Sequence, residues 1–183
     1  ADSIAVQNAG FQTNFEDGQG SVGEWAARTA GIHGNALGVS ICTSATAYEQ
    51  TAVTTTSGTE AAGQTTISVT DASVINVSDI VNFGETFEYE TTARNTTDNT
   101  IVIKLLDDPN GAGLQSQITS GTSIRRRWRF YDLFDGAPGT SAYATQNTRG
   151  NNDEIHIVVY DREGDLAGFS VDSNGNRTNA VLE

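Results

Sequence analysis

The sequence has a single cysteine, Cys42, so no disulfide can form within the chain. Cys42 ends an alternating apolar run with Leu37, Val39 and Ile41, which predicts a small, buried and unreactive thiol. No apolar stretch approaches the roughly 18 residues that a transmembrane helix needs. We therefore expect a soluble chain that depends on packing for its stability. With 183 residues, it should bury about 70% of the surface that the unfolded chain exposes.

Basic residues are also scarce. Ten Lys and Arg stand against 23 Asp and Glu, which gives a net charge of −13 and a pI near 4.3. Such a charge repels phosphate backbones, so we expect no direct binding to nucleic acid. The one basic cluster is the segment 123–131, SIRRRWRFY. If this segment is a strand, Trp128 and Phe130 share one face, and the alternate arginines share the other.

The alternate arginines of this segment are Arg125, Arg127 and Arg129, and two kinds of partner suit them. Glu88 and Glu90 share a face of another expected strand, so cross-strand ion pairs within the chain are one alternative. The other alternative is an acidic neighbouring subunit. We therefore take Arg125, Arg127 and Arg129 as a candidate subunit interface.

Motifs for catalysis and for metal binding are missing. The sequence has no Gly-x-Ser-x-Gly elbow, no phosphate-binding loop and no dinucleotide fingerprint. His33 and His156 are far apart, and no Cys-x-x-Cys or His-Glu-x-x-His spacing occurs, which argues against zinc. Residues 172–183 place oxygens at several positions of a calcium loop, but Arg177 stands where that loop needs glycine, so an Asn-Gly hairpin turn at 174–175 is preferred. We expect no catalytic residue, no cofactor and no metal.

Strand signals dominate the chain. The only helix signal is at 23–30, with Glu24 in its first turn and Gly31 after its end. Residues 51–63 are rich in Thr, Ser, Gly and Ala without periodicity, which is the composition of a linker. Alternating or β-branched segments between turn residues predict strands at 37–43, 65–70, 80–83, 86–92, 100–106, 123–131 and 155–160.

These segments predict a strand-rich α+β fold. We expect residues 55–131 to form a small antiparallel β-barrel or sandwich. This domain would be inserted into a mixed α/β layer that residues 1–54 and 132–183 build together. The glycines and the proline of 135–140 would supply the turn that returns the chain to the layer.

Two segments before the expected insertion resemble the contractile-tail sheath proteins of myovirus-type bacteriophages. They are 23–28, GEWAAR, and 31–41, GIHGNALGVSI. The second segment contains a Gly-x-x-Gly-Asn turn that leads into a strand. Ala30 stands where the family commonly has a proline.

The resemblance resumes after the expected insertion. The matching segments are 136–144, GAPGTSAYA, then 153–161, DEIHIVVYD, and finally AVLE at 180–183. Residues 170–179 are inserted before that closing segment. In all, the resemblance covers 20–50 and 132–183, and its segments occur in the family's order.

The resemblance implies a structural protein, and not an enzyme, whose copies stack helically around a tail tube. On contraction the copies would slide into a shorter and wider array, which drives the tube into the host. The implied partners are other copies of the chain, the tail tube protein and baseplate or neck proteins, with no membrane. The implied location is the tail sheath of the virion, after assembly in the host cytoplasm. Sheath subunits are longer than this chain, so it would be one region of a subunit.

A β-rich carbohydrate-binding or host-attachment module is the alternative function. Trp25, Trp128 and Tyr131 are the aromatic residues that favour it, together with loops rich in Thr, Asn and Asp. An enzyme with two carboxylates that approach each other in space is a further alternative, since a sequence cannot show such a separation.

Overall fold

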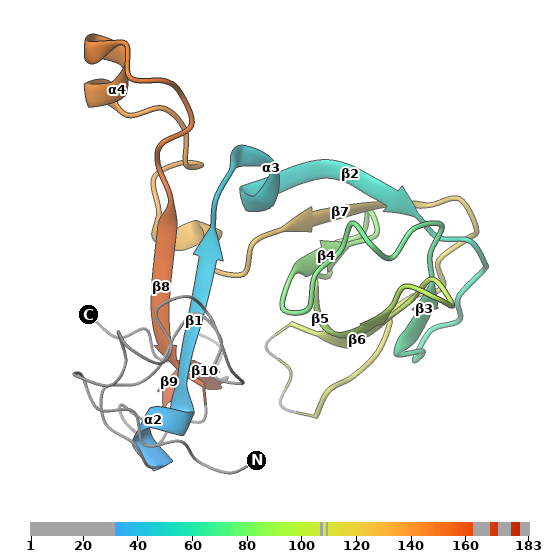
Figure 1. The fold of residues 1–183 in the computed structure, drawn as a ribbon. Coiled ribbons are helices and arrows are strands. Elements are labelled where there is room, and N and C mark those ends of the chain that lie inside the picture. Colours follow the sequence, from blue (N-terminus) through green and yellow to red (C-terminus); the bar gives the residue numbers. More distant parts are fainter. Residues whose placement is uncertain (1–31, 107, 109, 163–168, 172–176, 180–183) are drawn as a thin grey trace. The chain divides into compact units, whose positions relative to one another are not determined.

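The computed structural model describes residues 32–106, 108, 110–162, 169–171 and 177–179 (Figure 1). The chain divides into two compact units, one of Ala1–Ile41 with Ile157–Glu183 and one of Cys42–His156. The sequence pattern predicts domain borders at 54/55 and 131/132, and that assignment stays a prediction.

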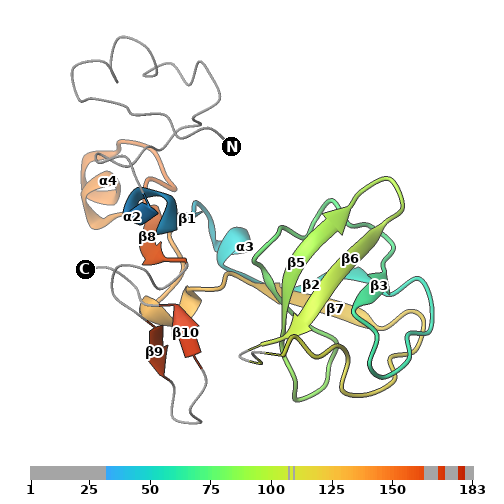
Figure 2. The same ribbon diagram turned by 90° about the horizontal axis from the view of Figure 1, so that it is seen from below.

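The unit Cys42–His156 contains a six-stranded antiparallel sheet with the strand order β2-β7-β4-β5-β6-β3. In Figures 1 and 2, the β5–β6 pair lies across the unit from the β2–β7 pair, so the sheet curves around its core. Its strands are β2 (Glu49–Thr55), β3 (Thr66–Ser68), β4 (Ile80–Asn82), β5 (Tyr89–Asn95), β6 (Thr100–Leu105) and β7 (Ser123–Arg127).

The two edge strands of this sheet, β2 and β3, are joined where they end. Thr56 forms an isolated antiparallel bridge with Val69. Beside it, the Thr70 N–H donates to the Thr55 carbonyl at 2.8 Å, and the Ser57 N–H donates to the Ser68 carbonyl at 2.9 Å. These bonds satisfy backbone groups that an open edge would leave to solvent.

The hydrophobic core of the sheet includes one tyrosine. The Tyr89 side chain is fully buried. Its hydroxyl donates to Glu85 Oε1 at 2.7 Å and accepts from the Gln115 N–H at 3.0 Å. Burial raises the pKa of Tyr89 to about 12. The core residues are Ile67, Val69, Ala72, Ile75, Val81, Phe83, Tyr89, Ile101, Ile103, Leu114, Ile118 and Ile124.

We expect the sheet to lose stability in alkali as Tyr89 ionises. Its pKa in the folded chain, about 12, lies above the ordinary value of 10.0. The contribution to stability is therefore complete below about pH 10 and is lost as the pH rises through about 12. Tyr89→Phe should remove this pH dependence and cost about 1–3 kcal/mol at neutral pH, because the Gln115 N–H loses its acceptor. Urea unfolding at several pH values measures both effects, and Tyr143→Phe is the control. If alkali destabilises Tyr89→Phe and the unchanged chain equally, the ionisation of Tyr89 is not the cause of the loss of stability.

Most of the strands expected for this unit are present. The predictions at 65–70, 80–83, 86–92 and 100–106 correspond to β3, β4, β5 and β6, with shifts of a few residues at their ends. The prediction at 123–131 is too long, because β7 stops at Arg127 and a 3-10 turn, η1 (Tyr131–Leu133), follows. Trp128 and Phe130 are nevertheless buried, as the alternation predicts.

The linker expected at 51–63 is wrong in its first part. Its threonines belong to β2, which pairs with β7 so that Glu49 lies opposite Arg127 and Thr55 opposite Ser123. Threonine suits a pleated strand. A register shift between Gln50 and Thr54 breaks the alternation along β2, which hides the strand period from a sequence pattern.

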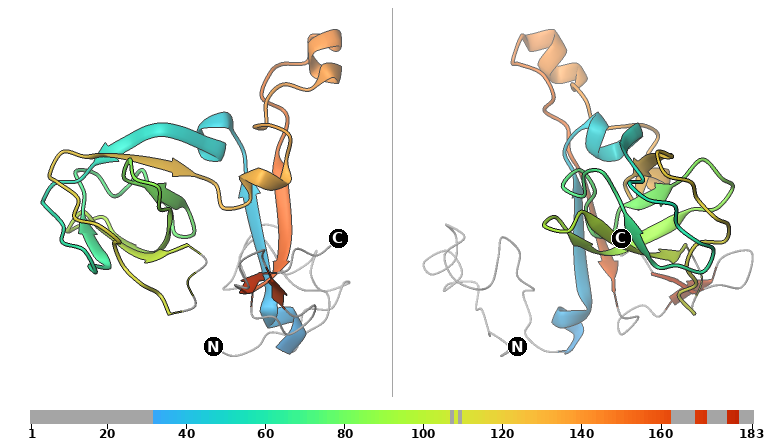
Figure 3. Two further views of the ribbon diagram at one scale, coloured as in Figure 1. Left: turned by 180° about the vertical axis from the view of Figure 1, so that it is seen from behind. Right: turned by 90° about the vertical axis from the view of Figure 1, so that its right-hand side faces the viewer.

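A second, two-stranded sheet pairs β1 (Leu37–Cys42) with β8 (His156–Asp161). The two strands run side by side in Figure 1 and in both views of Figure 3. The Arg162 N–H donates to the Ala36 carbonyl at 2.7 Å, just beyond the paired strands. This bond joins the start of β1 to the end of β8, so the two strands are antiparallel. They correspond to the predictions at 37–43 and 155–160, and Cys42 is buried as expected.

Helices are few and short among the described residues, so the chain is strand-rich, as predicted. They are α2 (Ile32–Ala36), α3 (Ala45–Tyr48) and α4 (Ala142–Asn147). In α4, the Ser141 hydroxyl accepts from the Ala144 N–H at 3.1 Å and caps the helix. In the portion of the chain that the structure describes, no helix is both long and apolar enough to span a bilayer.

A short antiparallel pair lies near the end of the sequence. It consists of β9 (Phe169–Val171) and β10 (Arg177–Asn179), with Val171 opposite Arg177. The Asn-Gly turn and most of the calcium-like segment at 172–183 lie outside the described residues, and so does the helix expected at 23–30.

Candidate functional site

Two of the three arginines proposed as an interface are held by carboxylates of the same unit. Arg127 donates to both carboxylate oxygens of Glu88, at 3.0 and 2.7 Å. Arg129 Nη1 donates to Glu90 Oε1 at 2.5 Å, and Lys104 pairs with the other oxygen of Glu90 at 2.9 Å. The intrachain alternative therefore applies to Arg127 and Arg129. Charge reversal at either position would place two carboxylates together within the fold.

Arg125 is placed differently. Its side chain is exposed, and it makes no hydrogen bond or ion pair with any described residue. Cross-strand pairing puts it opposite Asn82 of β4. Together with Arg127, it lines a pocket of about 230 Å³ formed by residues of β2, β7 and β4 and of the segment 85–88. Of the three proposed interface residues, Arg125 is the one that the unit leaves available to a partner.

Arg126 was not singled out from the sequence. Its Nη1 lies 3.1 Å from Asp79 Oδ2, and its Nη2 donates to the Thr46 carbonyl at 2.8 Å. Burial raises the pKa of Asp79, while the Asn76 N–H and the Arg126 charge act in the opposite direction. The alternation that buries Trp128 also places Arg126 on the buried face, where a cation needs an acidic partner. The alternation could therefore have identified Arg126 as a buried cation, but it could not have identified Asp79 as its partner.

The different surroundings of Arg125 and Arg127 give a direct test. We expect Arg127→Ala to lower the free energy of unfolding by about 1–2 kcal/mol, because Glu88 loses two charge-assisted hydrogen bonds. Arg127 also lies 4.3 Å from the centre of the Tyr131 ring, a contact that alanine removes. Arg125→Ala should change stability by less than about 0.5 kcal/mol, as is usual for an exposed side chain. Urea unfolding at neutral pH compares the two variants, and equal losses would contradict the assignment.

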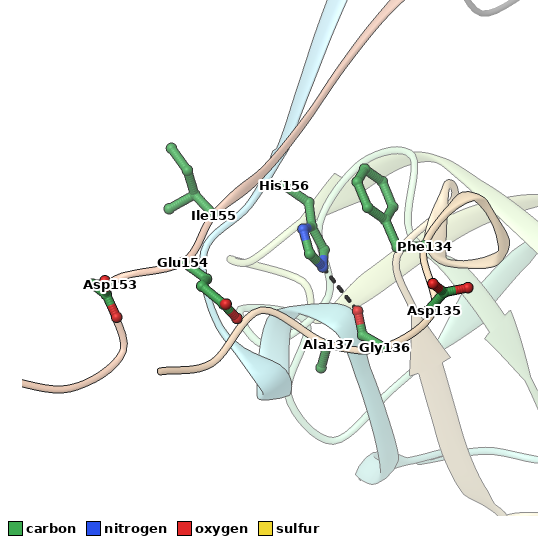
Figure 4. A pocket seen from close by; sticks show the side chains of 8 residues that line it. All are labelled: Phe134, Asp135, Gly136, Ala137, Asp153, Glu154, Ile155 and His156. Atoms are coloured by element: carbon green, nitrogen blue, oxygen red, sulfur yellow. Dashed lines mark hydrogen bonds between the residues drawn. The ribbon is translucent and has the colours of Figure 1, made fainter. Parts of the chain in front are cut away.

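A larger pocket, of about 610 Å³, lies between residues 134–137 and 153–156 (Figure 4). His156 Nε2 is 2.8 Å from the carbonyl oxygen of Gly136. The imidazole stacks on Phe134 with ring centres 4.0 Å apart. In Figure 4, the Asp135 carboxylate points away from His156. The imidazole therefore serves to hold the 134–137 segment against the start of β8.

The other two carboxylates of this pocket accept hydrogen bonds from residues 139–141. Asp153 accepts from the Ser141 N–H at 2.8 Å and from its hydroxyl at 2.7 Å. Both bonds lower the pKa of Asp153, and the bond from the Ser141 hydroxyl has the larger effect. Glu154 accepts from the Gly139 N–H at 3.0 Å. Within the described ranges, no three His, Cys, Asp or Glu side chains gather as metal ligands would.

The aromatic residues that favoured carbohydrate binding are mostly occupied. Trp128 is buried and packs edge-on against Phe130. Arg127 covers one face of Tyr131. Trp25 lies outside the described residues. A sugar-stacking platform needs an open ring face, and Trp128 does not offer one.

The β1–β8 sheet exposes apolar side chains on one face. Ile157 and Val159 alternate along β8 and are 41% and 36% exposed. The bond from the Arg162 N–H to the Ala36 carbonyl places Ile41, which is 37% exposed, opposite Ile157 in this antiparallel pair. We call Ile41, Ile157 and Val159 the apolar strip. Three β-branched side chains on adjoining strands form a contiguous surface, which is typical of contact sites.

The opposite face of the same sheet is covered. Val158 is buried, and the Tyr160 ring lies directly over Gly38, where a Cβ would come within 2.6 Å of Tyr160 Cε1. Glycine is therefore required at position 38 for this ring to pack on β1. Since one face is packed and the other exposed, the sheet is amphipathic.

A scan of protein-family models, a search of curated proteins and a search of solved structures each found no match to this chain. The functional interpretation therefore depends on the residues themselves and on their arrangement.

Proposed function

We propose that the chain is a region of a structural subunit of a contractile phage tail sheath, which polymerises helically around the tail tube and rearranges on contraction. The observation that carries this proposal is the pairing of β1 with β8. These strands come from two segments that resemble the sheath family, although all of residues 43–155 separate them in the sequence. A shared fold requires such segments to meet, and here they form one sheet.

The apolar strip supports an assembly role for this sheet. A pair of strands is marginally stable in water and gains stability from a third strand or from packing on one face. Covering Ile41, Ile157 and Val159 by a neighbouring copy would provide that packing, at about 25 cal/mol for each Å² of apolar surface removed from water.

We also propose that the intervening residues form a closed small β-barrel inserted into the sheath-like domain, with domain borders as predicted at 55–131. The hydrogen bonds that join the ends of β2 and β3 support closure, because a barrel needs its first and last strands to pair. In this view, β2 is the first strand of the barrel, and the predicted border at 54/55 falls just before its last residue, Thr55. The barrel decorates the subunit, and the apolar strip belongs to the sheath-like domain of residues 1–54 and 132–183.

The proposed work is mechanical and uses no catalytic group. Contacts between unlike surfaces of successive copies build open helical arrays. Two alternative arrangements of such contacts can store the free energy that contraction releases. Contacts with the tail tube and with baseplate or neck proteins would be made by the assembled full-length subunit.

Negative-stain electron microscopy of the intact gene product that contains this chain tests the proposal. We expect helical tubes or stacked rings when the protein is expressed alone and concentrated. Dispersed particles at every salt and protein concentration would contradict it. Glycan binding would then be the next property to measure.

A further inference from the structure

In the part of the chain that the structure describes, Asn110 is the one asparagine that a glycine follows. The Asn110 side chain is exposed, so solvent reaches its amide. Gly111 has a φ of +69°, and a Cβ built on it would meet no other part of the chain within 4 Å. Because glycine has no side chain, its backbone nitrogen can approach the amide carbon of Asn110 closely.

One carboxylate organises the main chain around Asn110. Asp108 accepts from the Asn110 N–H at 2.9 Å and from the Ala112 N–H at 2.8 Å. Both bonds lower the pKa of Asp108, the bond from Asn110 more strongly, and the Asn110 side chain adds the smallest effect. The Gly111 N–H donates to the Asp108 carbonyl at 3.2 Å, which is longer than the usual value of about 2.9 Å. The Asn110 amide and the Gly111 nitrogen are therefore only weakly held.

Two asparagines of the same sheet have different surroundings. Asn82 donates through Nδ2 to two carbonyls, at 2.7 and 2.8 Å, and the buried Phe83 follows it. Asn99 accepts from the Ala72 N–H at 3.1 Å. The residue after Asn99 is Thr100, whose branched side chain crowds its own backbone nitrogen. At both positions the amide is engaged and the next residue is bulky.

We propose that Asn110 is a site of spontaneous deamidation. Asparagine is among the residues that heat degrades. The Gly111 nitrogen gives up its proton and forms a bond to Cγ of Asn110. The bond from Cγ to the side-chain nitrogen breaks, and that nitrogen leaves as ammonia with the proton, so that a succinimide ring remains. Water then opens the ring. Attack at the side-chain carbonyl gives aspartate, and attack at the main-chain carbonyl gives isoaspartate.

The reaction would weaken the turn in which it occurs. Either product places a new carboxylate beside that of Asp108, and like charges repel. Isoaspartate also adds a methylene to the main chain. The Leu105 N–H, at the end of β6, donates to the Ala112 carbonyl at 2.6 Å, and this bond depends on the length of the intervening chain. We expect the Leu105 amide to exchange faster with solvent after conversion.

Incubation of the intact gene product in warm, mildly alkaline buffer tests the site, with peptide mapping by mass spectrometry as the readout. We expect aspartate and isoaspartate to accumulate at position 110, while Asn82 and Asn99 stay unchanged. Gly111→Ala should slow the conversion at least severalfold, because a methyl group hinders the approach of the nitrogen. Gly121→Ala is the matched control. Gly121 has a φ of +81° and equally open surroundings, so alanine brings similar backbone strain there without touching Asn110.

Circular dichroism during the incubation checks that the protein stays folded. If Asn110 stays unmodified, the proposal is wrong. Equal conversion at Asn82 and Asn99 would overturn it as well, because the local surroundings would then have no influence. If Gly111→Ala converts as fast as Gly121→Ala, attack by the Gly111 nitrogen is not the step that limits the reaction. None of these results depends on the proposed assembly role.

Discussion

Replacing Gly113 with alanine should unfold the six-stranded sheet or lower its free energy of unfolding by about 3 kcal/mol. A Cβ at this position would lie 2.6 Å from the carbonyl oxygen of Gly63 and 2.6 Å from the carbonyl carbon of Gln64. Both are backbone atoms, so no change of rotamer relieves the clash. Hydrogen bonds hold them in place, since the Gly63 N–H donates to the Leu114 carbonyl at 2.7 Å and the Leu114 N–H donates to the Gln64 carbonyl at 2.9 Å.

The matched control is Gly58→Ala. A Cβ there meets only Glu60 Oε1, at 3.5 Å, which is an ordinary van der Waals distance. We expect a change below about 0.5 kcal/mol, as for most surface substitutions. Urea unfolding followed by circular dichroism compares the two variants. Equal stability of Gly113→Ala and Gly58→Ala would show that the close approach of these two backbone segments is wrong.

Replacing Ile157 and Val159 together with aspartate should abolish helical assembly. If the apolar strip is covered in the array, each aspartate would have to be buried without a partner, which costs several kcal/mol. The concentration needed for assembly should then rise by at least about a hundredfold. The unit Cys42–His156 should keep its fold, because both side chains belong to the other unit.

A control for added negative charge is the double variant Thr96→Asp with Thr97→Asp. Both threonines are exposed in the turn between β5 and β6. Electron microscopy and sedimentation of the two double variants measure the effect. If the aspartates at 157 and 159 leave tubes intact, or if the control disrupts them equally, the strip is not an assembly surface.

The local alternation of apolar and polar residues was sufficient to predict most of the strands. It also predicted the burial of Cys42, Trp128 and Phe130. It failed at β2, where threonines of mixed exposure and a register shift removed the alternation that marks a strand. It also missed α4, whose six residues bury one side chain, Ala144. Such a short helix depends on its Ser141 cap and leaves almost no apolar period to detect.

Prediction of the candidate interface was limited by long-range pairing. Alternation placed Arg125, Arg127 and Arg129 on one face, but which of them is paired depends on the neighbours of β7. The strand order sets β4 beside β7 and β5 beyond β4. Because β4 has only three residues, the side chains of Arg127 and Glu88 can meet near its end. No sequence period encodes that order, so the availability of Arg125 was visible only in the fold.

Hydrogen exchange of the intact gene product, compared between dispersed and assembled protein, tests the central claim most directly. If the apolar strip is an assembly surface, the amides of β1 and β8 should exchange more slowly after assembly, because their local opening then requires loss of the contact. The amides of β5 and β6 should exchange at unchanged rates. Unchanged exchange in β1 and β8 on assembly, or the absence of any assembled state, would contradict the account.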